Sequence, residues 1–182
     1  VIGLLSGYLG GLTDRILMRL VDMQLAIPSL VLALVIVSVL SPGLLPLVLV
    51  VSIMSYPSFA RLARAVTLRV KAECYVEAAV IVGASNRRIV LRHILPNVLP
   101  HTLVLATVTL GRVVLSLSSL GFLGFGVRPG KPEWGMMVSQ ARSLFFGLPY
   151  LVFFPGMAIC LVVLGFNLLG DGLRDWWDPM LR

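Results

Sequence analysis

Long stretches without a charged side chain alternate along this chain with short clusters of charge. The stretches that carry no Asp, Glu, Lys or Arg are residues 23–60, 94–111, 113–127 and 143–170. A helix needs roughly 20 apolar residues to cross a hydrocarbon layer about 30 Å thick. The first stretch is nearly twice that length, and Ser41-Pro42-Gly43 and Pro46 interrupt it near its middle. The pattern therefore predicts membrane-spanning helices at about 23–40, 44–60, 97–120 and 150–170.

Composition excludes most other classes of protein. Hydrophobic residues make up 58% of the 182 residues and charged residues only 13%, which is too little polar surface for a soluble globule. No alternation of strand period is long enough for a membrane barrel. The formal net charge of +7 does not indicate nucleic-acid binding, because the positive residues cluster at the ends of apolar stretches. We therefore predict an all-α polytopic membrane protein that uses no cofactor.

The first twelve residues and the two cysteines also bear on the fold and on possible sites. The segment 1–12 is too short to span and lacks a basic start, so we expect the end of a helix whose beginning lies outside the sequence. Cys74 lies in a basic segment and Cys160 in an apolar one, and neither has the neighbours of a metal site. We expect neither a disulfide nor a bound metal.

The basic segment 61–93 sets the predicted orientation. It carries seven Lys or Arg residues against two Glu, a balance of +5. The loop 121–148, on the opposite side if the spans alternate, has a balance of only +2. Because positive charge favours the cytoplasmic side of a membrane, we place 61–93 in the cytoplasm and 121–148 outside.

Within 61–93, residues 73–86 are expected to form a short helix, a turn and a second helix, hereafter the knuckle. Arg69, Glu73 and Glu77 recur every four residues, which on one helix would give a charged stripe. Gly83 permits the left-handed backbone that ends a helix. Physical chemistry leaves two interpretations open, an interfacial helix lying on lipid headgroups or a surface on which a partner docks.

The spacing of small residues in this segment resembles a known motif. Glu77-Ala78-Ala79, Gly83 and Leu95-Pro96 are similar to the EAA loop of ABC importer permeases. That motif has Ile two places before Leu-Pro, where this chain has His93, and the apolar residue follows one place later as Ile94. GYLGGLTDRILMRLVDMQLAIPSLVLA, GFLGFGVRPGKPEWG and FNLLGDGLRDWWDP resemble the dipeptide, oligopeptide and nickel branch of these permeases.

The resemblance covers nearly the whole chain and implies a function. It implies a single permease domain over 1–182, with the type I helical bundle of ABC importers truncated at its N-terminus. Such a subunit sits in the bacterial inner membrane and forms half of a path for peptide-like or nickel solutes. Implied partners are two ATPase subunits, a second permease, an extracytoplasmic solute-binding protein and membrane lipid. The motif residues Glu77, Ala78, Ala79, Gly83, Leu95 and Pro96 would couple it to the ATPase.

Nothing in the sequence predicts a nucleotide site of its own. Gly130-Lys131 is followed by Pro132 rather than Ser or Thr, so it is no phosphate loop. We therefore expect a transport subunit that is not an enzyme. An ion-gradient-driven transporter or channel, and a membrane scaffold, are the alternatives. The gradient-driven transporter would be expected to carry acidic residues deep within a span.

Two further sets of residues are candidates for function. Arg112 is a charge within a predicted span, so it is expected either to reach the outer headgroups or to line the translocation path. In the outer loop, Arg128, Glu133 and Trp134 are candidates for contact with a solute receptor. The alternative for that loop is an interfacial helix anchored by Trp134.

Overall fold

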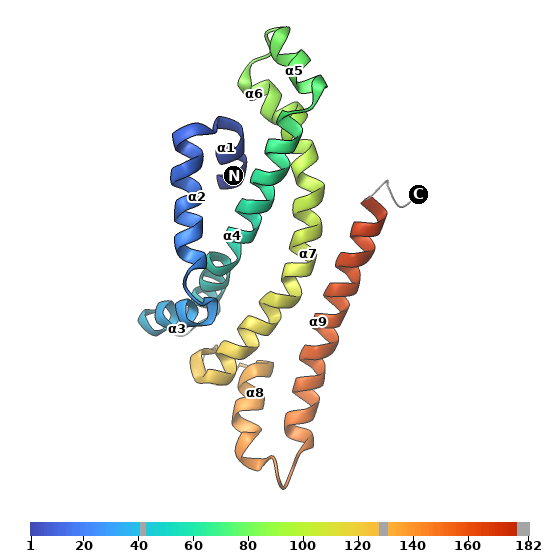
Figure 1. Cartoon of the computed structure of the whole chain (residues 1–182). Helices are drawn as coiled ribbons and strands as arrows, with labels where there is room; N and C mark the ends of the chain where they lie inside the picture. The colour runs from blue at the N-terminus through green and yellow to red at the C-terminus, as the bar shows by residue number, and fades with distance from the viewer. Residues whose placement is uncertain (41–42, 128–130, 178–182) are drawn as a thin grey trace. The chain divides into compact units, whose positions relative to one another are not determined.

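The computed structural model describes residues 1–40, 43–127 and 131–177, and its regular secondary structure there is helical (Figure 1). The predicted turn residues Ser41 and Pro42, and the predicted receptor-contact residue Arg128, lie outside the described residues. The α-helices are α1 (Ile2–Leu9), α2 (Gly11–Leu25), α3 (Ser29–Val39), α4 (Leu44–Lys71), α5 (Cys74–Ile81), α6 (Asn86–Ile89), α7 (Leu95–Leu120), α8 (Trp134–Ala141) and α9 (Tyr150–Trp177). The shorter elements are the π turns η1 (Val90–Ile94) and η2 (Gly121–Phe125) and the 3-10 turn η3 (Arg142–Leu144).

Three helical stretches are long and apolar enough to cross a membrane. They are Leu44–Lys71, the continuous stretch Asn86–Phe125, and Tyr150–Trp176. They confirm that the chain is all-α and polytopic, and they contain three of the four predicted spans. A fourth span is reached only if α2 and α3 are taken together.

The prediction of one helix over 23–40 is wrong. The structure breaks it into α2, which ends at Leu25, and α3, which begins at Ser29. Pro28 has no N–H to donate, and a proline disfavours helical geometry in the residue before it. Ile27 accordingly lies outside both helices, and the Pro28 backbone is extended at φ −54° and ψ 125°.

The chain divides by its contacts into two compact units. Unit 1 comprises Val1–Ile27 and Tyr56–Leu105, and unit 2 comprises Pro28–Ser55 and Ala106–Arg182. The helices α4 and α7 each contribute residues to both. The single permease domain over 1–182 therefore remains a prediction.

Unit 1 is built on close contact between α1 and α4. A Cβ placed on Gly3 would lie 1.9 Å from the carbonyl oxygen of Ala60, and one on Gly7 would lie 2.9 Å from the Cβ of Thr67. Only glycine allows the two backbones to approach so closely. The core of this unit is Ala63, Val66, Val70, Val76, Ile89, Ile94 and Val98, with Leu4 and Tyr8 packed against it.

Unit 2 packs α3, part of α4 and the end of α7 around a small core. Its buried residues are Ala33, Val37, Leu47, Val50 and Leu120. Gly111 and Gly170 bring α7 and α9 together, since a Cβ on Gly111 would lie 3.3 Å from the Val163 carbonyl oxygen. A Cβ on Gly170 would lie 2.6 Å from the side chain of Val108. Figure 1 shows α8 between the end of α7 and the start of α9.

Candidate functional site

The knuckle is a helix closed by a complete glycine cap. Gly83 has φ +86°, so the prediction of a left-handed residue there is confirmed. The N–H of Gly83 donates to the carbonyl of Val80 at 2.9 Å, and the N–H of Ala84 donates to that of Ala79 at 3.0 Å. These two bonds define a Schellman motif, which satisfies carbonyls that the end of α5 would leave unpaired. Ala79 and Gly83 of the predicted motif thus belong to one local structure.

The predicted charged stripe through the knuckle is wrong. The last turn of α4 closes with the N–H groups of Ala72 and Glu73 donating to Arg69 and Val70 at 3.1 Å. Glu73 then adopts an extended backbone, φ −78° and ψ 137°, as the N-cap of α5. Arg69, Glu73 and Glu77 therefore do not lie on one continuous helix.

One side of the knuckle is buried and its tip is open. Val76 is 2% exposed and packs in the core of unit 1, which fixes α5 to the unit. Glu77 and Ala78 are exposed and Ala79 is half-buried. At the tip, Ile81 and Val82 are 84% and 88% exposed. Two exposed apolar side chains thus stand at the tip of the knuckle, next to the glycine cap.

The second half of the motif lies at a π turn. The N–H of Leu95 donates to the carbonyl of Val90 five residues earlier, so η1 widens the helix just before Pro96. Ile94 is fully buried in the core, which confirms that the apolar anchor sits one place late. His93 instead lies half-buried beside Tyr75, with 5.9 Å between the ring centroids. The π turn joins Leu95-Pro96 to α6 without a break in the helix.

Tyr8 contacts the chain just before the knuckle and at the knuckle's last residue. Its hydroxyl donates to Oδ1 of Asn86, the first residue of α6, at 2.8 Å. Its carbonyl oxygen accepts from Nζ of Lys71, the last residue of α4, at 2.8 Å. The same ammonium lies 5.4 Å from the centroid of the Tyr8 ring, within the range of a cation–π contact.

Two ion pairs join α2 to α4. Arg64 donates from Nε and Nη2 to the two carboxylate oxygens of Asp14, both at 2.6 Å, and Ser6 also donates to Asp14. Such a two-point pair fixes orientation as well as distance. Arg61 pairs with Asp22 at 2.6 Å, but both side chains are about half exposed, so this pair stabilises the fold little.

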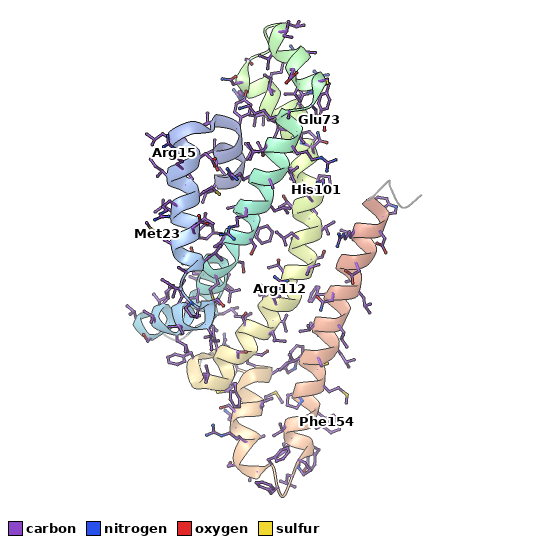
Figure 2. The ribbon with its side chains drawn as sticks, in the orientation of Figure 1. Arg15, Met23, Glu73, His101, Arg112 and Phe154 are labelled. Carbon is purple, nitrogen blue, oxygen red and sulfur yellow. The ribbon has the colours of Figure 1, made fainter. Side chains whose placement is uncertain are left out.

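Arg112 projects from α7 in unit 2 and is exposed (Figure 2). Among the described residues it makes no ion pair. The adjacent Gly111 faces α9, so Arg112 lies about 100° further around the helix. Its role in a translocation path stays a prediction.

Glu133 is turned inward rather than toward solvent. Its carboxylate lies over Gly121 and Gly126, where an added Cβ would lie 2.2 and 2.3 Å from the nearest carboxylate oxygen. The Val127 N–H donates to this carboxylate, while Oε2 is buried without a hydrogen-bond partner among the described residues. Desolvation by burial raises the pKa of Glu133, and the Val127 hydrogen bond opposes that shift. Trp134, the next residue, begins α8 and is 39% exposed.

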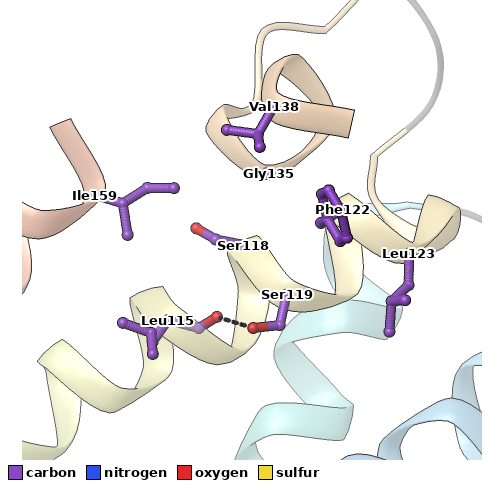
Figure 3. Close-up of a pocket in the computed structure, with 8 residues that line it drawn as sticks. All are labelled: Leu115, Ser118, Ser119, Phe122, Leu123, Gly135, Val138 and Ile159. Carbon is purple, nitrogen blue, oxygen red and sulfur yellow. Dashed lines mark hydrogen bonds between the residues drawn. The ribbon is translucent and has the colours of Figure 1, made fainter. Parts of the chain in front are cut away.

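An apolar pocket of about 320 Å³ opens between α7, α8 and α9 (Figure 3). Its apolar lining includes Leu115, Phe122, Val138 and Ile159, and its polar lining residues are Ser118 and Ser119. The Ser119 hydroxyl donates its proton to the Leu115 carbonyl at 2.8 Å, so it can only accept from a ligand there. The pocket offers apolar contact and little else.

The sequence did not single out Tyr8, Lys71, Asn86, Asp14 or Arg64. Asp14 and Arg64 are charges beside apolar stretches, and that placement was a usable signal for a pair. Tyr8 gave no such signal, because its partners are 63 and 78 residues away along the chain.

A chain whose helices are long and apolar enough to cross a membrane three or four times is a multi-pass membrane protein. The family model of the binding-protein-dependent transport system inner membrane component matches residues 1–182. The chain therefore belongs to that family, which places it in a bacterial inner membrane.

Several curated proteins are similar over the whole chain. The glutathione transport system permease protein GsiD of Pectobacterium atrosepticum is 44% identical over 181 residues, which are 100% of this chain and 60% of that protein. The dipeptide transport system permease proteins DppC of Alkalihalophilus pseudofirmus and Haemophilus influenzae are 42% and 44% identical over 181 residues, with 60% and 61% of their lengths covered. The chain thus spans about 60% of the length of these relatives.

Proposed function

We propose that the protein containing this chain is a permease subunit of an ATP-driven ABC importer, which takes hold of an ATPase through the knuckle. The supporting observation is the knuckle itself, a capped helix with the EAA spacing and an exposed apolar tip. The buried Val76 would transmit force from that tip into the core of unit 1.

The individual motif residues take distinct roles in this proposal. Ala78 and Ala79 leave room for a partner to approach the α5 backbone, and Glu77 offers an exposed carboxylate beside them. Gly83 holds the turn that presents Ile81 and Val82. Leu95 and Pro96 carry the movement into α7 through the π turn.

The proposed partners follow from the family and from the expectation that other subunits hydrolyse ATP. Two ATPase subunits would supply the energy, a second permease subunit the other half of the path, and an extracytoplasmic solute-binding protein the cargo. Because the similar proteins are named for dipeptide and glutathione transport, we propose a short peptide or glutathione as the solute. Nickel is a solute that the resemblance also implies, and it should be tested in the same transport assay.

The outer loop is proposed to meet the solute-binding protein. Trp134 is the best-placed described residue, because the Glu133 carboxylate faces the glycines of the loop. A photocrosslinker at Trp134 should join the two proteins in an active transporter. Absence of any adduct would favour a loop that only anchors in the membrane interface.

Substitutions in the knuckle test the coupling role. Gly83→Val forces a β-branched residue into left-handed backbone, whereas Gly83→Asn is tolerated there. We expect Gly83→Val to abolish solute uptake while ATP hydrolysis and membrane insertion persist, and Gly83→Asn to retain uptake. Uptake and ATPase activity are measured on the reconstituted complex.

A charge reversal gives the second comparison. Glu77→Lys should uncouple hydrolysis from uptake, while Asp171→Lys, at an exposed acid of α9 outside the knuckle, should not. Normal uptake by both Gly83→Val and Glu77→Lys would refute coupling through the knuckle.

A further inference from the structure

The α1–α2 hairpin is held against α4 at several points. Gly3 and Gly7 lie against the α4 backbone at distances that admit no side chain. Beyond them, Asp14 is held by two hydrogen bonds from Arg64 and one from Ser6. Close backbone packing and a two-point ion pair together leave the hairpin little freedom relative to α4.

Tyr8 extends from this fixed hairpin toward the knuckle. It lies in the last turn of α1, directly before Gly10 and Gly11, whose φ values of +67° and +55° turn the chain into α2. Its ring also packs against the core cluster that contains Val76, so its position is set by packing as well as by hydrogen bonds.

The contacts of Tyr8 fall on the two places where the knuckle joins the rest of unit 1. Lys71 ends α4 two residues before the knuckle, and its ammonium lies both on the Tyr8 carbonyl and over the Tyr8 ring. Asn86 starts α6 and is the last residue of the knuckle, and it accepts from the Tyr8 hydroxyl. One side chain thus contacts the chain where it enters the knuckle and where it leaves.

We propose that Tyr8 is a positioning residue that ties both ends of the knuckle to the α1–α2 hairpin, so that a push on the knuckle moves the hairpin and α4 with it. This inference rests on the proposed coupling function. Without Tyr8, the knuckle would still be held by Val76 and Ile89 in the core but could tilt at its two ends.

The test uses the complete transporter, with this protein in its full length. Tyr8→Phe removes only the hydroxyl, and Lys71→Met removes the ammonium while keeping an apolar stem. Tyr150→Phe and Arg69→Met are matched controls, since Tyr150 is an exposed tyrosine of unit 2 and Arg69 an exposed cation in the same last turn of α4. Hydrogen–deuterium exchange is followed in residues 72–89 and, for comparison, in residues 107–120 of α7.

Both test variants should exchange the amides of 72–89 about fivefold faster, the equilibrium factor expected for one ordinary hydrogen bond, with no change in 107–120. The controls should leave both segments unchanged. Unchanged exchange in 72–89 of Tyr8→Phe and Lys71→Met would overturn the tether.

A functional readout separates positioning from mere stability. Import of glutathione and of a dipeptide is measured per ATP hydrolysed, and both test variants should import less solute per ATP at unchanged complex yield. Faster exchange with an unchanged ratio would overturn the positioning role. A wild-type complex that imports neither probe would count against the proposed function, and the exchange measurement would still decide the tether.

Discussion

At the scale of single residues, glycines allow several of the closest contacts in this chain. Gly83 ends α5, and Gly3 and Gly7 allow α1 to pack closely against α4. Gly121 and Gly126 leave room for the Glu133 carboxylate. The left-handed role of Gly83 was predictable, because a glycine after a short helix is a common C-terminal signal. The close contacts of Gly3 and Gly7 were not, because their partners Ala60 and Thr67 are distant in sequence.

The contact between Glu133 and Gly121 gives a prediction that only this geometry makes. A Cβ on Gly121 would lie 2.2 and 2.4 Å from the two carboxylate oxygens of Glu133, so Gly121→Ala should destabilise the protein by about 1–3 kcal/mol, the usual range for overpacking. Shortening the acid by one methylene withdraws these oxygens. Gly121→Ala combined with Glu133→Asp should therefore be more stable than Gly121→Ala alone.

Thermal unfolding of the purified protein in detergent measures this effect. Gly156→Ala is the matched control, because a Cβ there meets nothing within 4 Å. If the double variant loses as much stability as the two single variants together, the Glu133 carboxylate does not lie against Gly121.

At the scale of elements, the apolar stretches predicted the long helices well and the breaks between them poorly. Leu44–Lys71 continues eleven residues past the predicted end of its span at residue 60. Charge marks where apolar character ends but does not end a helix, because arginine is a good helix former. Arg61 and Arg64 lie within α4 and pair with Asp22 and Asp14 on α2. Conversely, the apolar pattern predicted one helix over 23–40, and the structure ends α2 at Leu25 and begins α3 at Ser29, after Pro28.

The close packing of α1 against α4 gives a prediction at this scale. Gly7→Leu places a bulky side chain against the Arg64 carbonyl and the Thr67 side chain, so it should displace α1 and destabilise unit 1 by about 1–3 kcal/mol or more. Gly165→Leu, in α9 with open space around it, should change stability by less than about 0.5 kcal/mol.

Thermal unfolding and hydrogen exchange of residues 60–70 provide the measurements. If α1 is seated as described, exchange there rises in Gly7→Leu and stays the same in Gly165→Leu. Equal stability of the two variants would show that α1 does not pack on α4.

At the scale of the whole molecule, family membership was predictable because the motifs extend along the entire chain. The knuckle residues are contiguous enough in sequence to be identified without a structure. The contacts that hold the knuckle in unit 1 were not predictable, because they join α1 to residues 63 and 78 places later. The sequence pattern thus located the candidate site but did not reveal the contacts that hold it in place.

The predicted orientation is the property on which every proposed partner depends. The ATPase must meet the knuckle on one side of the membrane, and the solute-binding protein must meet the outer loop on the other. Cys74 is exposed at the start of α5, and Lys131 is exposed in the segment before α8. The predicted orientation places these two positions on opposite sides of the membrane.

Labelling with a membrane-impermeant thiol reagent tests this arrangement in a Cys160→Ser background, since Cys160 is also an exposed free thiol. In sealed right-side-out vesicles, Cys74 should react only after permeabilisation. Lys131→Cys, with Cys74→Ser to isolate it, should react at once. Inverted vesicles should reverse the two results. Equal accessibility of both positions from one side would mean an even number of crossings between 74 and 131, and the proposed division between ATPase side and receptor side would then fail.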